Sequence, residues 1–90
     1  MKTIWKYIIS DPISDIRLPQ GAQLLTIAEQ HGKIALWALV DPQAPSTIRR
    51  VQVVGTGHDE VPTPTPPYIG TAHMLNGQLI LHAFDLGEPT

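Results

Sequence analysis

The chain has 90 residues, a formal net charge of −2 and a pI of about 6.0. It contains no cysteine, which excludes disulfides, thiolate nucleophiles and thiolate zinc ligands. It also has no run of lysines or arginines, so neither duplex nucleic acid nor an anionic membrane is an expected partner. The hydrophobic fraction of 42% predicts a folded domain, and a chain this short has a modest core that self-association would enlarge.

The first stretch, residues 3–9, is predicted to be a β-strand. It is rich in β-branched and aromatic residues, and Ser-Asp-Pro follows it and ends the strand. Its apolar run is short and interrupted by Lys6, so it predicts neither a signal peptide nor a membrane span. Residues 14–22 predict a second, weaker strand that ends in a turn at Pro19 to Gly21.

The clearest long signal lies in residues 23–41, where two apolar runs surround His31-Gly32. Glycine adopts positive φ without strain, which favours a two-residue hairpin loop at this position. In that register the facing pairs are Gln30 with Lys33, Ala28 with Ala35, Thr26 with Trp37 and Leu24 with Leu39. The other face would form the core, with Leu25, Ile27, Ile34, Leu36, Ala38 and Val40.

A helix near residues 22–31 is the alternative for the first half of this hairpin, and it would make the fold α+β. Its apolar stripe would hold Leu24, Leu25, Ile27 and Ala28, with Gly32 as the C-terminal cap. The stretch is short, lacks a good N-cap and lies among strands, so the strand is the preferred prediction.

Residues 47–55 resume the strand pattern after a proline-containing loop. A proline-rich loop at 58–67 then carries Pro62, Pro64, Pro66 and Pro67, which forbid both a helix and a sheet ladder. We expect this loop to be an extended, semi-rigid arm of polyproline type.

The last hairpin is predicted by Asn76-Gly77, which favours a type I′ turn between two strands. The facing pairs would be Leu75 with Gln78, His73 with Ile80 and Thr71 with His82, and the opposite, apolar face would hold Met74, Leu79, Leu81, Ala72 and Ala83. Together these elements predict a mainly antiparallel all-β fold of about six strands over residues 1–90, as one small sandwich or partly open barrel.

The candidate binding residues centre on the turn-like segment Gly55, Thr56, Gly57 and His58. Its backbone amides, the threonine hydroxyl and the imidazole could hold an anion. A glycine turn that only ends a strand would account for the same residues. Proline-rich chain follows instead of a helix, and the Lys-Ser/Thr pair of a nucleotide-hydrolase loop is missing. The segment is therefore a candidate site for binding and not for catalysis.

Two further side chains complete the predicted ligand site. The guanidinium of Arg50 fits a carboxylate or phosphate, and the ring of Trp37 could stack on a base or complete the core. His73 and His82 would lie diagonally across the last hairpin, but a zinc site normally needs a third protein ligand, so we predict no metal. Because the serines lie in loops with no histidine nearby in sequence, we expect no catalytic residues, no cofactor and no enzymatic activity.

The segments "KTIWKY", "LPQGAQLL", "LWALVDPQAP", "RRVQVVGTGH", "YIGT" and "GQLILHAF" together resemble a family of small proteins of unknown function that are encoded by bacteriophages and prophages. The resemblance covers nearly the whole chain. It implies an accessory protein that acts by binding in the cytoplasm of the bacterial host, and it supplies no catalytic residues.

Two function hypotheses follow from these residues and this resemblance. In the first, a homo-oligomer sequesters a small anionic, nucleotide-like ligand to counter host defence, using Gly55, Thr56, Gly57, His58, Arg50 and Trp37. In the second, a sheet face or the rigid proline-rich arm covers a host protein and inhibits it. A structural virion component is a third interpretation of the strand-rich pattern.

Overall fold

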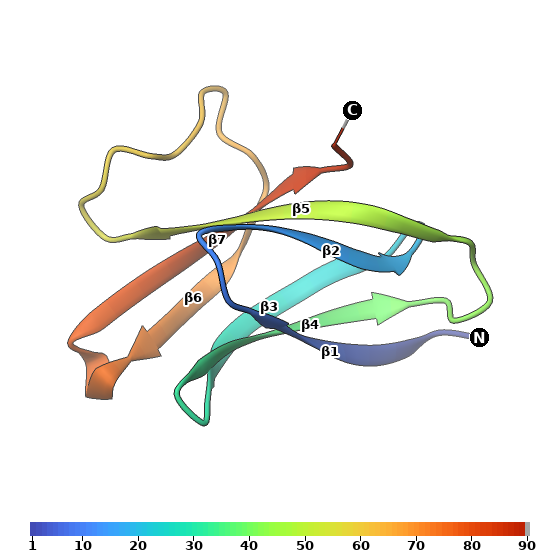
Figure 1. Cartoon of the computed structure of the whole chain (residues 1–90), viewed down its shortest axis with the longest axis horizontal. Coiled ribbons are helices and arrows are strands. Elements are labelled where there is room, and N and C mark those ends of the chain that lie inside the picture. Colours follow the sequence, from blue (N-terminus) through green and yellow to red (C-terminus); the bar gives the residue numbers. More distant parts are fainter. Residues whose placement is uncertain (90) are drawn as a thin grey trace.

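A computed structural model describes residues 1–89 of the chain (Figure 1). Its seven strands are β1 (Thr3–Ile9), β2 (Ile13–Pro19), β3 (Gln23–Gln30), β4 (Lys33–Val40), β5 (Ser46–Gly55), β6 (Tyr68–Met74) and β7 (Leu79–Gly87). All pairings are antiparallel, which confirms the all-β prediction with one strand more than the expected six. The helix near residues 22–31 is wrong, because this stretch pairs with β4 as β3.

The strands form two sheets that do not close into a barrel. The first sheet has the order β1-β4-β3, and the second has the order β2-β5-β7-β6. A single core cluster lies between them and takes residues from both: Ile9, Ile16, Leu18, Ala22, Ile27, Leu36, Ala38, Val40, Val51, Val53, Ile69, Ala72 and Ala83. The part of the chain that the structure describes holds no helix with the length and hydrophobicity of a membrane span.

The two sheets approach each other most closely where β6 passes β3. At Gly70 of β6, an added Cβ would lie 3.0 Å from Thr26 Oγ1 and 3.2 Å from the backbone nitrogen of Ile27. Such contacts are tighter than side chains normally make, so the absence of a side chain at Gly70 is what lets the two strands lie this close.

The hairpin at His31-Gly32 forms as predicted, because both residues take positive φ, 54° and 79°. The predicted pairs of Gln30 with Lys33, Ala28 with Ala35 and Thr26 with Trp37 are also confirmed. A bulge between Leu24 and Thr26 then shifts the register, so Leu24 faces Ala38 and not Leu39. Leu25, the extra residue of the bulge, is 37% exposed and does not belong to the core, contrary to the prediction.

The turn at Asn76-Gly77 is also confirmed, with φ values of 56° and 86° and a hydrogen bond from the Gln78 amide to the Leu75 carbonyl (3.1 Å). His73 faces Ile80 and Thr71 faces His82, as expected. Leu75 itself has positive φ, so the ladder ends one residue earlier, at the pair of Met74 and Leu79. Leu75 and Gln78 therefore close the turn without extending the sheet.

The proline loop, residues 56–67, contains neither helix nor strand, but it is not a free arm. It bends at Thr63 and Pro64 and returns from the end of β5 to the start of β6 (Figure 1). Gln52 Nε2 donates a hydrogen bond to the Glu60 carbonyl (3.0 Å), and the Asp85 amide donates one to the Pro67 carbonyl (2.8 Å). Both ends of the prolines are thus tied to the sheet.

The proline loop explains why outward-pointing residues of the second sheet are buried. Val54 and Phe84 lie on the face opposite the core, yet they are only 2% and 7% exposed. Val61 of the loop lies at the same pocket as both of them. The loop therefore acts as a cover for the part of the outer face formed by β5 and β7.

Candidate functional site

The four central site candidates lie together at a small pocket where β5 enters the proline loop. Gly55, Thr56, Gly57 and His58 line a cavity of about 190 Å³, with the remaining walls from Val54, Val61, His82 and Phe84. Its wall is thus partly apolar and partly made of hydroxyl and imidazole groups. Pockets for drug-sized molecules start at roughly 300 Å³, so this cavity accommodates a smaller group or one part of a larger ligand.

The backbone of this segment forms a turn that uses two of its own amides. The Thr56 amide donates to the Ile80 carbonyl (3.2 Å), and the His58 amide donates to the Gly55 carbonyl (3.1 Å). Gly57 has a φ of 87°, a conformation that favours glycine. Two of the amides that the anion hypothesis relied on are therefore engaged within the fold.

A hydrogen-bonded network surrounds His82 beside this pocket. Thr56 Oγ1 lies 2.7 Å from His82 Nε2, and the Tyr68 hydroxyl lies 2.7 Å from His82 Nδ1. The Tyr68 hydroxyl also bonds Thr71 Oγ1, which lies 3.5 Å from Nδ1. Hydroxyl groups both donate and accept, so this network satisfies either tautomer of the ring. It fixes the imidazole at the pocket, where the side chains of Thr56, His58 and His82 form the polar part of the wall.

The sequence predicted only one contact of this network, the pairing of Thr71 with His82. Tyr68 was missed because simple alternation places residues 68 and 71 on opposite faces of a strand. A bulge between Tyr68 and Gly70 inserts one residue and brings both side chains to the same face. Thr56 lies beyond the end of β5, so its approach to His82 depends on the fold of the loop.

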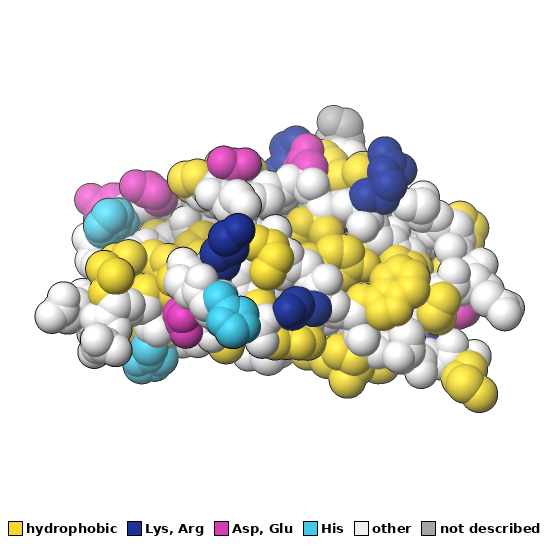
Figure 2. Space-filling view, turned by 60° about the horizontal axis from the view of Figure 1, so that its bottom comes forward, with side chains coloured by type: hydrophobic (Ala, Val, Ile, Leu, Met, Phe, Trp, Pro, Cys, Tyr) yellow, Lys and Arg dark blue, Asp and Glu magenta, His cyan; other side chains and the backbone are white. Residues whose placement is uncertain are grey.

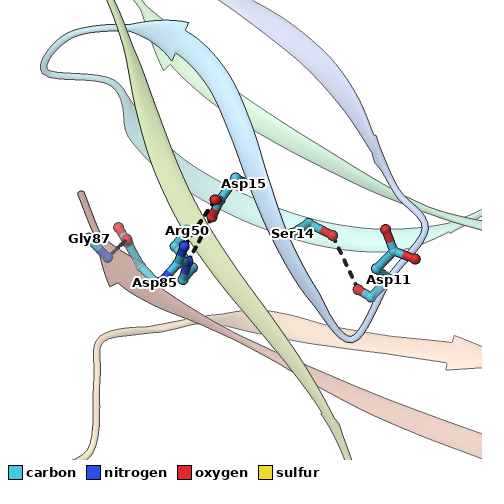
Figure 3. A network of polar contacts seen from close by, with 6 residues as sticks. All are labelled: Asp11, Ser14, Asp15, Arg50, Asp85 and Gly87. Atoms are coloured by element: carbon cyan, nitrogen blue, oxygen red, sulfur yellow. Dashed lines mark hydrogen bonds and ion pairs between the residues drawn. The ribbon is translucent and has the colours of Figure 1, made fainter. Parts of the chain in front are cut away.

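Arg50 and Trp37 lie away from the pocket. Arg50 precedes Gly55 by five residues on the same strand, which corresponds to about 17 Å along an extended chain. Its guanidinium forms two hydrogen bonds with the Asp15 carboxylate, of 2.7 and 3.0 Å (Figure 3). Trp37 belongs to β4 in the first sheet. The structure therefore brings four of the six predicted ligand residues together and leaves these two elsewhere.

The Arg50–Asp15 pair is exposed, and the hydrogen bonds between the two side chains shift the pKa values of both. The hydrogen bond from Arg50 lowers the pKa of Asp15 below its usual value, and the same bond raises the pKa of Arg50. The neighbouring Arg49 is more buried, donating to Asp85 Oδ2 (2.9 Å) and to the Ala22 carbonyl (3.0 Å). Both guanidinium groups of this strand thus have partners within the protein.

The histidines show no metal-site arrangement. His58 Nδ1 lies 3.8 Å from Glu60 Oε1, an exposed contact, while His82 is held by hydroxyl groups. Within residues 1–89, no group of three or more His, Cys, Asp or Glu side chains is placed to hold a metal ion.

A second candidate surface is the outer face of the first sheet. Its register places Ile4, Lys6 and Ile8 of β1 beside Leu39, Trp37 and Ala35 of β4, all on the side opposite the core. We call these six residues the uncovered face, although Ala35 itself is fully buried. Ile4 and Ile8 are 55% and 45% exposed, and Trp37 and Leu39 are partly exposed. On the face drawn in Figure 2, hydrophobic side chains lie in several groups, with Lys or Arg side chains between them.

The lysines are concentrated on this side of the fold. Lys6 and Lys33 belong to β1 and β4, and Lys2 directly precedes β1. The Lys6 ammonium donates to Gln30 Oε1 (2.6 Å), but none of the three lysines forms an ion pair within the described part of the chain. Neither β1 nor β4 contains an acidic residue. The uncovered face is therefore apolar with a positive border.

The whole chain, residues 1–90, matches the family described as a domain of unknown function (DUF7352), and the chain belongs to this family. No curated protein and no solved structure matches it. The expected membership in a family of unknown function is confirmed, while the bacteriophage origin stays part of the proposals below.

Proposed function

We propose that the protein acts by binding another protein through the uncovered face. The observation that carries this proposal is the exposure of Ile4 and Ile8 on a sheet face that also holds Trp37 and Leu39. Isolated exposed apolar residues are common, but a contiguous apolar group on one face typically marks an interaction site. Tryptophan is also enriched among the residues that dominate binding energy at protein interfaces.

The proposal favours a sheet face over the proline arm as the contact surface. The proline loop is tied to the second sheet at Glu60 and Pro67, so a partner would have to displace these bonds to use it as a free segment. The uncovered face needs no such rearrangement, because its side chains already point away from the core.

A matched pair of charge substitutions tests this proposal. Ile8→Glu places a charge on the uncovered face, and Leu75→Glu places one at an exposed leucine in the turn between β6 and β7. We expect proteins that co-purify with the tagged wild-type chain from bacteria to be lost with Ile8→Glu and retained with Leu75→Glu. Equal retention by both variants, with both folded by circular dichroism, would contradict the proposal.

A second candidate function is the sequestration of a small nucleotide-like ligand by a homo-oligomer. It is favoured by the pocket at Gly55, Thr56, Gly57 and His58, where Thr56 and His82 present polar groups beside the apolar Phe84. Because the cavity is small, a second subunit would have to supply further contacts to a whole nucleotide. Arg50 and Trp37 of a neighbouring subunit are the residues that we propose for that role.

Native mass spectrometry tests this second function. The protein is purified from cells with an active nucleotide-based defence, and any released ligand is weighed after denaturation. We expect an oligomer that carries an intact, chemically unaltered ligand, and loss of that ligand in Thr56→Val. A chemically altered ligand would point to an enzyme and overturn the non-enzymatic interpretation. A monomer without a bound ligand would contradict the proposed sequestering function.

The resemblance to bacteriophage proteins supports the biological setting of both functions. On that basis we propose an accessory protein in the cytoplasm of the bacterial host that counters host defence, by inhibiting a host protein or by removing a signal. A structural virion component is the remaining alternative. Detection of the chain in purified virions, at the copy number of a capsid or tail protein, would favour that alternative.

A further inference from the structure

The strand at the border of the uncovered face has a free backbone edge. β1 lies at the end of the order β1-β4-β3 and pairs only with β4 within residues 1–89, so the N–H and C=O groups on its other side have no strand partner among these residues. Its register with β4 runs without a shift from Thr3 to Ile9. Of its seven residues only Ile9 is buried. A seven-residue edge of this kind is a template for another strand.

The other sheet borders are less suited to strand addition. β3 and β6 each contain a bulge and pack against each other at Gly70. β2, the remaining edge, ends at Pro19 and carries the charged side chains of Asp15 and Arg17. β1 contains neither a bulge nor a proline. It is therefore the edge at which an added strand would meet the fewest obstacles.

The charges near β1 select among partners. Lys6 lies at the middle of the strand between Ile4 and Ile8 on the uncovered face. Its ammonium donates to the neutral side chain of Gln30 on β3, and neither β1 nor β4 supplies an acid to neutralise its charge. A second copy of β1 would bring another Lys6 into the same small region, and like charges close together on paired strands are destabilising. A carboxylate at the facing position would instead be attracted.

We infer that β1 accepts an extended acidic segment of a partner protein as an added strand, an inference that rests on the protein-binding function proposed above. Side chains alternate along a strand, so the residues that face Ile4, Lys6 and Ile8 are two positions apart in the partner. The partner segment therefore has the pattern apolar-x-acidic-x-apolar. Its apolar residues extend the uncovered face, its acid pairs with Lys6, and its backbone completes the free edge of β1.

A display library of random nine-residue peptides tests this inference on the full chain. We expect selection on the wild-type protein to enrich apolar-x-acidic-x-apolar peptides, and selection on Lys6→Glu to enrich the same pattern with Lys or Arg at the centre. A facing charge pair contributes up to about 1 kcal/mol, and Lys6→Glu replaces this attraction with a repulsion between like charges. We therefore expect the variant to bind an acidic peptide at least about fivefold more weakly. An acid-to-lysine change in that peptide should restore its affinity for the variant.

N-methylation of the selected peptide tests the backbone pairing. Methyl groups on alternate amides along one edge should abolish binding, and methyl groups on the opposite edge should leave it intact, because a strand uses only one edge for each neighbour. Equal tolerance at both edges would overturn strand addition.

The outcomes also separate this inference from the proposed function. Peptides that bind and are lost with Ile8→Glu, but show no acidic preference and no response to Lys6→Glu, would overturn the inference and keep the uncovered face as a binding site. A library without any enriched peptide, together with Ile8→Glu that retains every co-purified protein, would overturn both. A concentration-dependent dimer that Ile8→Glu dissociates would identify a second copy as the occupant and overturn the acidic partner.

Discussion

The outer faces of the two sheets differ in what lies over them. Over β5 and β7 of the second sheet, the chain supplies its own cover, and the proline loop buries Val54 and Phe84. Over β1 and β4 of the first sheet, the apolar side chains of Ile4 and Ile8 remain exposed. Both faces carry large apolar side chains, so the presence of such residues alone does not distinguish them. The covered part of the second sheet therefore contributes buried apolar area to the fold, whereas Ile4 and Ile8 contribute less, which is the contrast on which the proposed partner binding rests.

The largest change in stability should come from a substitution on the outer face of β5 and β7, which the proline loop covers. Phe84→Ala removes a ring that packs edge-on against Tyr68 beneath the proline loop, and we expect the free energy of unfolding to fall by about 3 kcal/mol. Ile8→Ala on the uncovered face is the matched control and should change it by no more than about 0.5 kcal/mol. Urea denaturation measures both values. Equal losses would remove the contrast between the two faces.

The next effect concerns the contact that joins the two sheets. Gly70→Ala adds a Cβ within 3.0 Å of Thr26 Oγ1 and 3.2 Å of the Ile27 nitrogen, and backbone atoms cannot turn away as side chains do. We expect a loss of about 2 kcal/mol, measured by urea denaturation. A Gly70→Ala protein as stable as the wild type would show that β3 and β6 can separate freely.

A smaller change, this time an increase in stability, is expected for a substitution on the inner side of β1. The Tyr7 hydroxyl is buried without a hydrogen-bond partner among residues 1–89, and burial raises the pKa of this group. Tyr7→Phe removes the unsatisfied hydroxyl and should raise the free energy of unfolding by about 1 kcal/mol. A melting temperature of Tyr7→Phe below that of the wild type would mean that the hydroxyl has a hydrogen-bond partner in solution.

The smallest effect is a pH dependence at the exposed pair on the second sheet. The hydrogen bond from Arg50 lowers the pKa of Asp15 in the folded state, so the pair stabilises the fold above the unfolded pKa of about 3.9. This contribution is lost as pH falls through the lowered folded value. Asp15→Asn should therefore reduce stability slightly at pH 6 and flatten the decline of the urea midpoint below pH 4. An unchanged pH profile would contradict the role of this pair.

The features that local chemistry determines could be predicted from the sequence. His31-Gly32 and Asn76-Gly77 each supply two residues suited to positive φ, and both hairpins follow from that requirement. The grouping of Gly55 to His58 at one site is also local, because the four residues are consecutive. Alternation placed Trp37 on the side opposite the core, where the structure has it.

The features that depend on non-local packing could not be predicted. The bulges near Leu25 and Ile69 change the face of the sheet on which the following side chains lie. No residue type at these positions predicts a bulge. The network of Tyr68 and Thr56 with His82 follows from one of these bulges and from the fold of the loop. The uncovered face depends on which strands share a sheet, which is set by contacts far apart in sequence.

The most direct test of the uncovered face is site-specific photocrosslinking in bacterial cells. A photoreactive amino acid at Ile8 reports on the uncovered face, and the same group at Leu75 reports on the exposed turn between β6 and β7. We predict that Ile8 yields a discrete protein adduct of fixed mass and that Leu75 does not. The absence of any adduct at Ile8, or adducts of equal yield at both positions, would contradict the assignment of this face to a partner.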